Sequence, residues 1–254
     1  MNKLTLVALT CRKILAVAAL ASLWASGAAG LTFGAQADHG EPSSVADIGA
    51  RRELFVDDWL IDNLQGVALK LQQPVPQEVA VTFDEPNEGN VGYYVRVFRD
   101  GDIVRMYYRG AHWDWETKKT THEVVCYAES KDGLRWTKPK LGLFEFGGSK
   151  DNNIVWTKVG CHNFSPFRDS NPDGKPNEHY KALGSGDRGL VAFASADGLR
   201  WRLMQDKPVI TKGAFDSQNL AFWDQHRGRY VDFHRGFTAG VRAIMTCTSS
   251  DFLN

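Results

Sequence analysis

The sequence predicts an all-β protein of the β-propeller type, with about three four-stranded blades present in this chain. Three observations favour this fold class. A seven-residue motif repeats, two kinds of predicted hairpin alternate along the chain, and no long stretch after the N-terminal region places apolar residues at helical spacing. Two hairpins make four strands, and four strands in roughly 50 to 65 residues is the size of one propeller blade.

The repeated motif is Ser-Lys-Asp-Gly-Leu-Arg-Trp at 130–136, which recurs at 195–201 with Ala in the second position. A third copy begins at Ser249, and the chain ends at Asn254, where the next residue of the motif would be the Trp. Each copy follows an apolar run, supplies a tight turn and leads into a further strand. We therefore assign a structural role in the turn to the three motif aspartates, Asp132, Asp197 and Asp251.

A second type of hairpin precedes the motif and completes each predicted blade. Apolar runs flank the turn at 99–102 and again the turn at 224–227. On this spacing we place blades at about 84–140, 150–205 and 215–254, the last of them incomplete. Residues 52–82 contain two further apolar runs and are predicted to form leading strands.

The first 37 residues are predicted to be a signal peptide. A basic leader precedes an apolar run of about a dozen residues, and Ala35-Gln36-Ala37 offers a cleavage site before Asp38. The run is short for a membrane span, which needs roughly 20 apolar residues, although a retained anchor is the alternative. We expect a secreted or periplasmic protein in which a linker, 38–51, precedes the propeller.

Charge and cysteine content exclude several kinds of partner. The 30 basic residues balance the 30 acidic ones, so no net charge recruits nucleic acid, or a membrane after signal cleavage. After the leader the chain keeps Cys126, Cys161 and Cys247, an odd number without close spacing, so we expect free thiols rather than a disulfide framework. No Cys-x-x-Cys or His-x-x-x-His pair is present, and we predict neither a metal nor a cofactor.

The Ser-x-Asp-Gly-x-x-Trp motif, together with the hairpin Asp100 to Tyr108, resembles the five-bladed glycoside hydrolases of the invertase, arabinanase and mannoside phosphorylase kind. The segment Arg52 to Ile61 resembles secreted bacterial proteins described as invertase-like by fold. The motif is also similar to the structural Asp-boxes of sialidases. The resemblance covers about 52–254 and implies a secreted protein that acts on poly- or oligosaccharides. It also implies that the chain stops before the propeller is complete.

Glycosidic bond cleavage needs two carboxyl groups on opposite sides of the bond. The resemblance implies that such groups lie where the chain enters the innermost strand of successive blades. Glu88 occupies this position in the first blade and Asp216 in the third, and we predict them as the catalytic pair. His162 and Asn163 occupy it in the second blade, where arabinanase-like enzymes carry a third acid, and we predict that they bind substrate.

Other residues are expected near the same pocket. We predict that Arg109, His234 and Arg235, at the ends of strands, bind substrate. We also predict substrate binding by Trp113. Together with Trp115 it could stack on sugar rings or, as the alternative, anchor its loop. Asp57 and Asp58 are further candidate acids. Asp169 aligns with the hairpin turns at Asp100 and Asp224, and we interpret it as a structural turn residue. A carbohydrate-binding propeller without catalysis is the alternative function.

Overall fold

The computed structural model describes residues 47–254, and the chain divides into two units, 1–73 and 74–254. The predicted signal peptide, 1–37, lies outside the described residues. In the first unit, the described residues 47–73 contain turns and bends but no strand. No helix within 47–254 has the length and apolar character that a membrane crossing requires.

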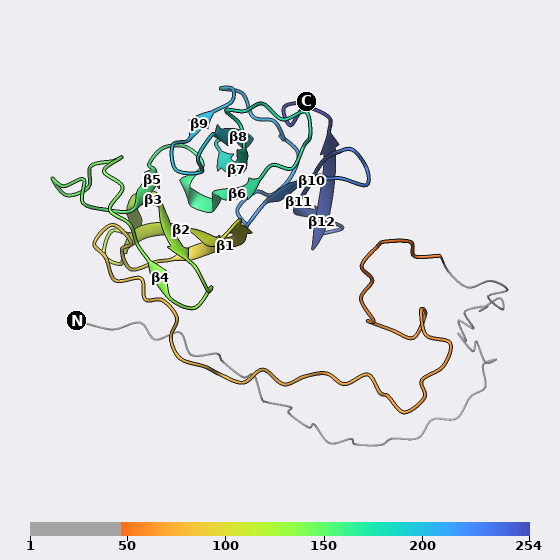
Figure 1. The fold of residues 1–254 in the computed structure, drawn as a ribbon. Coiled ribbons are helices and arrows are strands. Elements are labelled where there is room, and N and C mark those ends of the chain that lie inside the picture. The colour runs from red at the N-terminus through yellow and green to blue at the C-terminus, as the bar shows by residue number, and fades with distance from the viewer. Residues whose placement is uncertain (1–46) are drawn as a thin grey trace, which may run out of the picture. The chain divides into compact units, whose positions relative to one another are not determined.

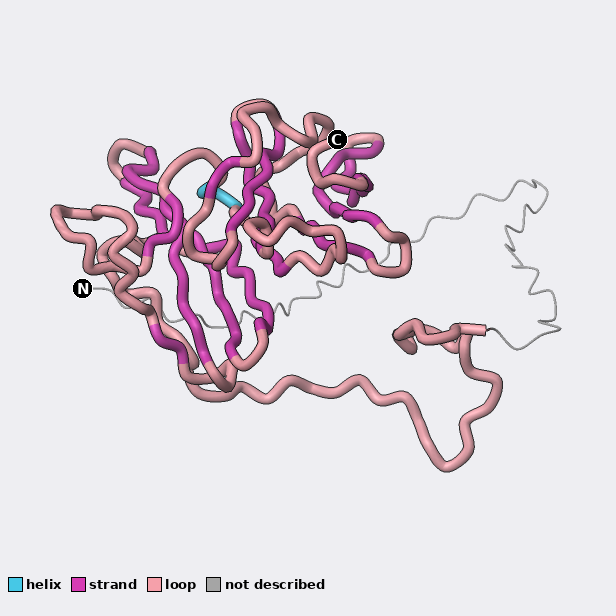
Figure 2. Tube along the Cα trace, turned by 45° about the horizontal axis from the view of Figure 1, so that its top comes forward, coloured by secondary structure: helices cyan, strands magenta, loops and turns pink. Residues whose placement is uncertain are grey.

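The second unit consists of three antiparallel sheets that follow one another along the chain (Figures 1 and 2). The first has the order β1-β2-β3-β4, with β5 paired to β3, the second β6-β7-β8-β9, and the third β10-β11-β12. A single 3₁₀ turn, η1, is the only helical element in the described part of the chain. The elements are β1 (Tyr93–Asp100), β2 (Ile103–Asp114), β3 (Lys119–Ser130), β4 (Trp136–Thr137), β5 (Ile154–Trp156), η1 (Cys161–Asn163), β6 (Ser165–Arg168), β7 (Tyr180–Gly186), β8 (Gly189–Ser195), β9 (Arg202–Leu203), β10 (Leu220–Asp224), β11 (Arg229–Thr238) and β12 (Val241–Ser249).

Each sheet is an up-and-down meander of sequential strands, which is how a propeller blade is built. The all-β prediction and the three blade-type sheets are therefore confirmed. The second sheet has the four strands predicted for a blade, whereas the first has four sequential strands and β5 as a fifth. The total number of blades in a closed ring stays a prediction.

The structure corrects two details of the strand prediction. Residues 52–82 form no strand, and Leu54 and Leu71 in its apolar runs are more than 80% exposed. An apolar run forms a strand only when its backbone can pair with a neighbouring strand. No described strand pairs with residues 52–82. Residues 154–156, expected in the second blade, form β5 and pair with β3 of the first sheet.

The repeated motif forms the same turn three times. Ser130 Oγ accepts the amide hydrogen of Gly133 at 2.8 Å, and Asp132 Oδ1 accepts those of the next two residues, both at 2.8 Å. The copies at Ser195 and Ser249 repeat this pattern. The aspartates therefore satisfy backbone donors that the turn would otherwise leave unpaired, and their predicted structural role is confirmed.

The core lies between neighbouring sheets. Because side chains alternate across a strand, Tyr107 of β2 packs toward the second sheet, whereas Tyr108 packs into an apolar cluster on the other face. Trp201, the last residue of the second motif, is buried between the first and second sheets, and its Nε1 donates to Gly198 O at 2.9 Å. Trp201 therefore fills the space between the two sheets, and we refer to this as its plug role.

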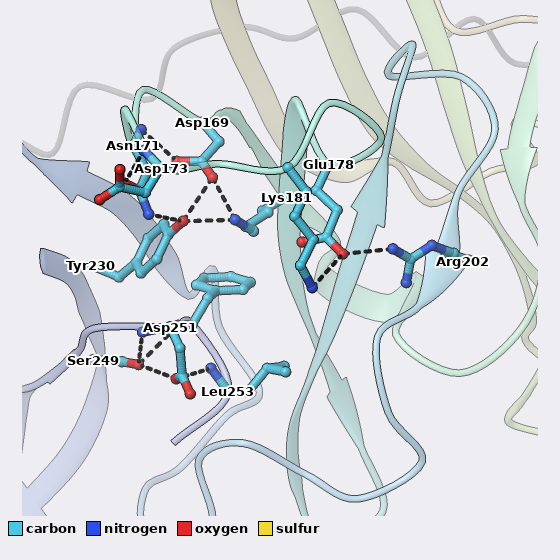
Figure 3. Close-up of polar contacts among 12 residues, drawn as sticks. Asp169, Asn171, Asp173, Glu178, Lys181, Arg202, Tyr230, Ser249, Asp251 and Leu253 are labelled. Carbon is cyan, nitrogen blue, oxygen red and sulfur yellow. Dashed lines mark hydrogen bonds and ion pairs between the residues drawn. The ribbon is translucent and has the colours of Figure 1, made fainter.

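A buried polar network joins the second sheet to the third (Figure 3). Lys181 Nζ of β7 lies 2.5 Å from Asp169 Oδ2, and both side chains are at least 96% buried. Tyr230 of β11 donates its hydroxyl hydrogen to the same Asp169 oxygen at 2.7 Å and accepts one from Lys181 at 2.6 Å. Asp169 is therefore a structural residue, as predicted, with an ion pair in addition to its turn contact with the Asn171 amide.

Candidate functional site

Tyr94 lies at a distortion in the first strand. The register of β1 against β2 shifts between Tyr93 and Arg96, and Tyr94 adopts a left-handed backbone with φ 58°. A bulge of this kind re-aims a side chain, and a positive φ is costly for an aromatic residue. Such strain persists only where the surrounding structure holds it, and it is common at functional sites.

Charged groups from the first and third blades influence the Tyr94 phenol. Its pKa is raised, first by burial and then by Asp216, with Glu123 adding a smaller effect, while Arg109 and Arg235 act in the opposite direction. The ring of His162 lies 5.4 Å from the Tyr94 ring, centroid to centroid. We refer to these residues as the Tyr94 cluster: Tyr94, Arg109, Glu123, His162, Asp216 and Arg235.

Glu123 links two members of this cluster. It precedes a buried stretch of β3, and its Oε1 pairs with Arg109 Nη2 of β2 and with His162 Nδ1 of η1 at 3.1 Å. The hydrogen bond from His162 lowers the pKa of Glu123, and Arg109 adds to this effect through its charge. The Glu123 side chain keeps 29% of its surface exposed, so an ionised carboxylate remains accessible in the cluster.

Asp216 lies on a loop that buried amides fix in place. Asn163, which is fully buried, donates to the carbonyl oxygens of Phe215 and of Ser217, the latter at 2.6 Å, and accepts the Ser185 amide at 2.8 Å. The Asp216 side chain itself is 79% exposed, with Arg235 Nη2 3.3 Å from its Oδ1. Asn163 therefore positions the loop rather than presenting its own amide to a ligand.

Glu88 belongs to a different set of contacts. It is buried, its Oε1 accepts the Tyr108 hydroxyl hydrogen at 2.5 Å, and its Oε2 lies 2.8 Å from Lys138 Nζ and from the amide nitrogen of Glu85. Tyr108 alternates with Arg109 along β2 and so lies on the other face of the sheet. The catalytic role of Glu88 stays a prediction, and its described contacts are outside the Tyr94 cluster.

The remaining predicted residues are spread over the structure. His234 is buried beside Asp232 in the third sheet. Trp113 falls inside β2 rather than in a loop, is half-buried, and exchanges two hydrogen bonds with Asn90. Trp115 is 77% exposed and meets Trp113 edge to face. Asp57 and Asp58 are exposed residues of the first unit.

Four residues of the Tyr94 cluster were predicted as site residues: Arg109, His162, Asp216 and Arg235. Tyr94 and Glu123 lie in the same cluster but were not predicted. Two signals pointed to Glu123. It is an acidic residue directly before the apolar run at 124–128, and hairpin pairing sets it opposite Ala111, two residues after Arg109. No sequence feature pointed to Tyr94, because the alternation of apolar and polar residues along a strand does not show where a bulge will form.

Comparisons with known proteins found sequence similarity to an uncharacterized protein and structural similarity to solved glycosidases. No protein-family model matches it. An uncharacterized protein of Mycobacterium tuberculosis, found in the strains CDC 1551 / Oshkosh and H37Rv, is 27% identical over 210 residues, which cover 76% of this chain and 65% of that protein.

Solved structures with a related arrangement include a glycosyl hydrolase from Bacteroides ovatus, with 20% identity, a TM-score of 0.38, and coverage of 61% of this chain and 46% of that one. Another represents the mannoside phosphorylase family containing glycoside hydrolases that target β-1,2 mannosidic linkages in Candida mannan. It has 18% identity, a TM-score of 0.38, and coverage of 60% and 47%. The chain thus spans about half the length of these solved chains. TM-scores at this level do not transfer an activity.

Proposed function

We propose that this chain belongs to an exported, glycoside hydrolase-like protein that acts on poly- or oligosaccharides, with the Tyr94 cluster as its sugar site. One observation carries the proposal. His162 contacts Glu123 of the first blade, and the adjacent Asn163 holds the loop that carries Asp216 of the third blade, so groups from three blades meet around Tyr94. A site assembled from several blades is the arrangement that a propeller offers at the mouth of its axis.

The chemistry of the cluster suits a glycosidic bond. Cleavage requires one carboxylate that stays ionised and a second group that gives a proton to the leaving oxygen. The lowered pKa of Glu123 fits the ionised role, either as nucleophile or as the base that activates water. Asp216 is the second carboxyl group, and the Tyr94 phenol, whose pKa is raised by burial, stays protonated beside them.

A carbohydrate-binding role without cleavage is the second candidate, and the charge balance of the cluster favours it. Glu123 is already compensated by Arg109 and His162, and Asp216 lies near Arg235. Paired charges of this kind offer hydrogen-bond donors and acceptors to sugar hydroxyl groups without a net charge. The exposed ring of Trp115 adds an apolar face suited to stacking.

The experiment measures both binding and turnover on a panel of glycans, with release of reducing sugar as the catalytic readout. We expect Glu123→Gln and Asp216→Asn each to abolish release, while Glu116→Gln, an exposed residue of the β2–β3 turn, leaves it unchanged. Circular dichroism confirms that each variant folds.

Glu88→Gln separates the two candidate carboxylates. If folded Glu88→Gln protein loses turnover while Glu123→Gln retains it, the acid role returns to Glu88 and the Tyr94 cluster is not the catalytic site. Binding that needs Glu123 and Asp216 without any turnover supports the second candidate. Neither binding nor turnover on any glycan would overturn both.

A further inference from the structure

Three side chains with metal-binding chemistry share one face of the third sheet. Asp232 and His234 are two residues apart on β11 and so point to the same side. Cys247 of β12 is directly opposite Asp232 in the strand register, which places its side chain on that side as well. One ligand atom from each lies within 4.8 Å of the other two.

The Asp232 carboxylate is incompletely satisfied. It is 95% buried, and its Oδ2 has no hydrogen-bond partner among the described residues. An unpaired buried carboxylate oxygen is costly, so its retention calls for a partner. A cavity of about 420 Å³ adjoins it, with Asp232, Cys247, Thr211 and Lys212 in its lining.

The hydrogen bonds of His234 determine which ring nitrogen is available. Nε2 lies 3.0 Å from the carbonyl oxygen of Lys212, which only accepts, so Nε2 carries the hydrogen. In neutral imidazole Nδ1 is then an acceptor, and it lies 2.5 Å from Asp232 Oδ1. Two acceptors at this distance require a positive centre, either a proton or a metal ion.

The same contacts exclude a cysteine–histidine relay. A nucleophilic Cys247 would need a free histidine nitrogen as its base, but one nitrogen of His234 bonds to a carbonyl and the other faces Asp232. A backbone carbonyl that fixes the histidine tautomer is instead the usual support of a metal-bound imidazole.

We propose that Asp232 Oδ, His234 Nδ1 and Cys247 Sγ bind a zinc ion, with a fourth position open toward the cavity. A mixed oxygen, nitrogen and sulfur set suits zinc and disfavours calcium and magnesium, which take oxygen ligands. Zinc–ligand distances of about 2.0–2.3 Å require the His234 and Asp232 side chains to separate slightly as the ion enters. Sequence motifs do not reveal the site, because strand pairing rather than local spacing assembles it.

The first test is cobalt titration of the whole metal-free chain, because a thiolate ligand to Co²⁺ gives a charge-transfer band in the near ultraviolet. We expect one equivalent to saturate the band and zinc to displace it. Cys247→Ser should remove the band, and Asp232→Asn and His234→Asn should abolish saturable binding. Cys126→Ser and His226→Asn, a buried cysteine and an exposed histidine outside the three, should leave it unchanged.

The second test needs no variant and so does not depend on mutant folding. Alkylation of the native wild-type chain, mapped by mass spectrometry, should modify Cys247 when metal is absent and spare it when one equivalent of zinc is present. Cys126 and Cys161 are buried and should not change. Absence of the cobalt band, a band that survives in Cys247→Ser, or zinc-independent alkylation of Cys247 would each overturn the proposal.

Discussion

Asp169→Asn should be among the most damaging isosteric substitutions in this chain. The carboxylate is 98% buried, 2.5 Å from Lys181 Nζ and 2.7 Å from the Tyr230 hydroxyl. The amide preserves the shape but leaves the Lys181 charge buried without its counter-ion. Removing one partner of a buried ion pair costs about 3–5 kcal/mol. For a domain of this size that corresponds to a fall in Tm of roughly 6–20 °C.

Thermal and urea unfolding of the whole chain, followed by circular dichroism, measure this loss. Asp173→Asn is the matched control, because its carboxylate is exposed on the same loop, and its effect should stay within about 0.5 kcal/mol. Asp169→Leu combined with Lys181→Met should recover much of the stability, because neither charge then remains. An Asp169→Asn protein within about 1 kcal/mol of wild type would refute the reasoning.

Three further predictions concern the core, the strand contacts and the cluster. Trp201→Ala should lose about 3–5 kcal/mol in urea unfolding, while Trp115→Ala, at an exposed ring, stays near wild type; equal effects would contradict the plug role. Gly184→Ala should lower the free energy of unfolding by about 1–3 kcal/mol, because the new methyl group would lie 2.6 Å from Gly160 O. An unchanged melting temperature would show that β7 and the segment at Gly160 can move apart at no cost. The lowered pKa of Glu123 stabilises the fold fully above its ordinary value of 4.5, and this contribution is lost as the pH falls through the lowered value. The stability difference between wild type and Glu123→Gln should therefore shrink on acidification, and a difference that is constant with pH would contradict the assigned shift.

The propeller-type fold could be predicted because it is encoded locally and repeatedly. A turn such as 130–136 specifies its own hydrogen bonds, so three copies of it, with the second type of hairpin, reveal three blades without knowledge of the packing. The apolar runs in 52–82 mislead for the opposite reason. Strand formation in this segment depends on a neighbouring strand, which the local sequence does not specify. Leu54 and Leu71 are exposed because no such strand pairs with the segment.

The candidate site was predictable only in part, because it depends on which face of a strand a residue occupies. Arg109, His162, Asp216 and Arg235 were identified from their positions at strand ends and entrances. Glu88 shares such a position, yet its carboxylate contacts Tyr108 rather than the Tyr94 cluster. The bulge at Tyr94 changes the direction of one side chain in a way that composition and spacing do not record.

The loop that carries Asp216 is fastened by the carboxamide of Asn163, whereas Glu123 is held by groups that carry charge. A carboxamide does not ionise in water. Acid that protonates Glu123 therefore leaves intact the hydrogen bonds from Asn163 that hold the Asp216 loop. Acidification to below pH 4.5, the ordinary pKa of a glutamate, should therefore remove the charge of Glu123 before the Asp216 loop is lost. On return to neutral pH, recovery should need only the release of a proton from Glu123, with no refolding step.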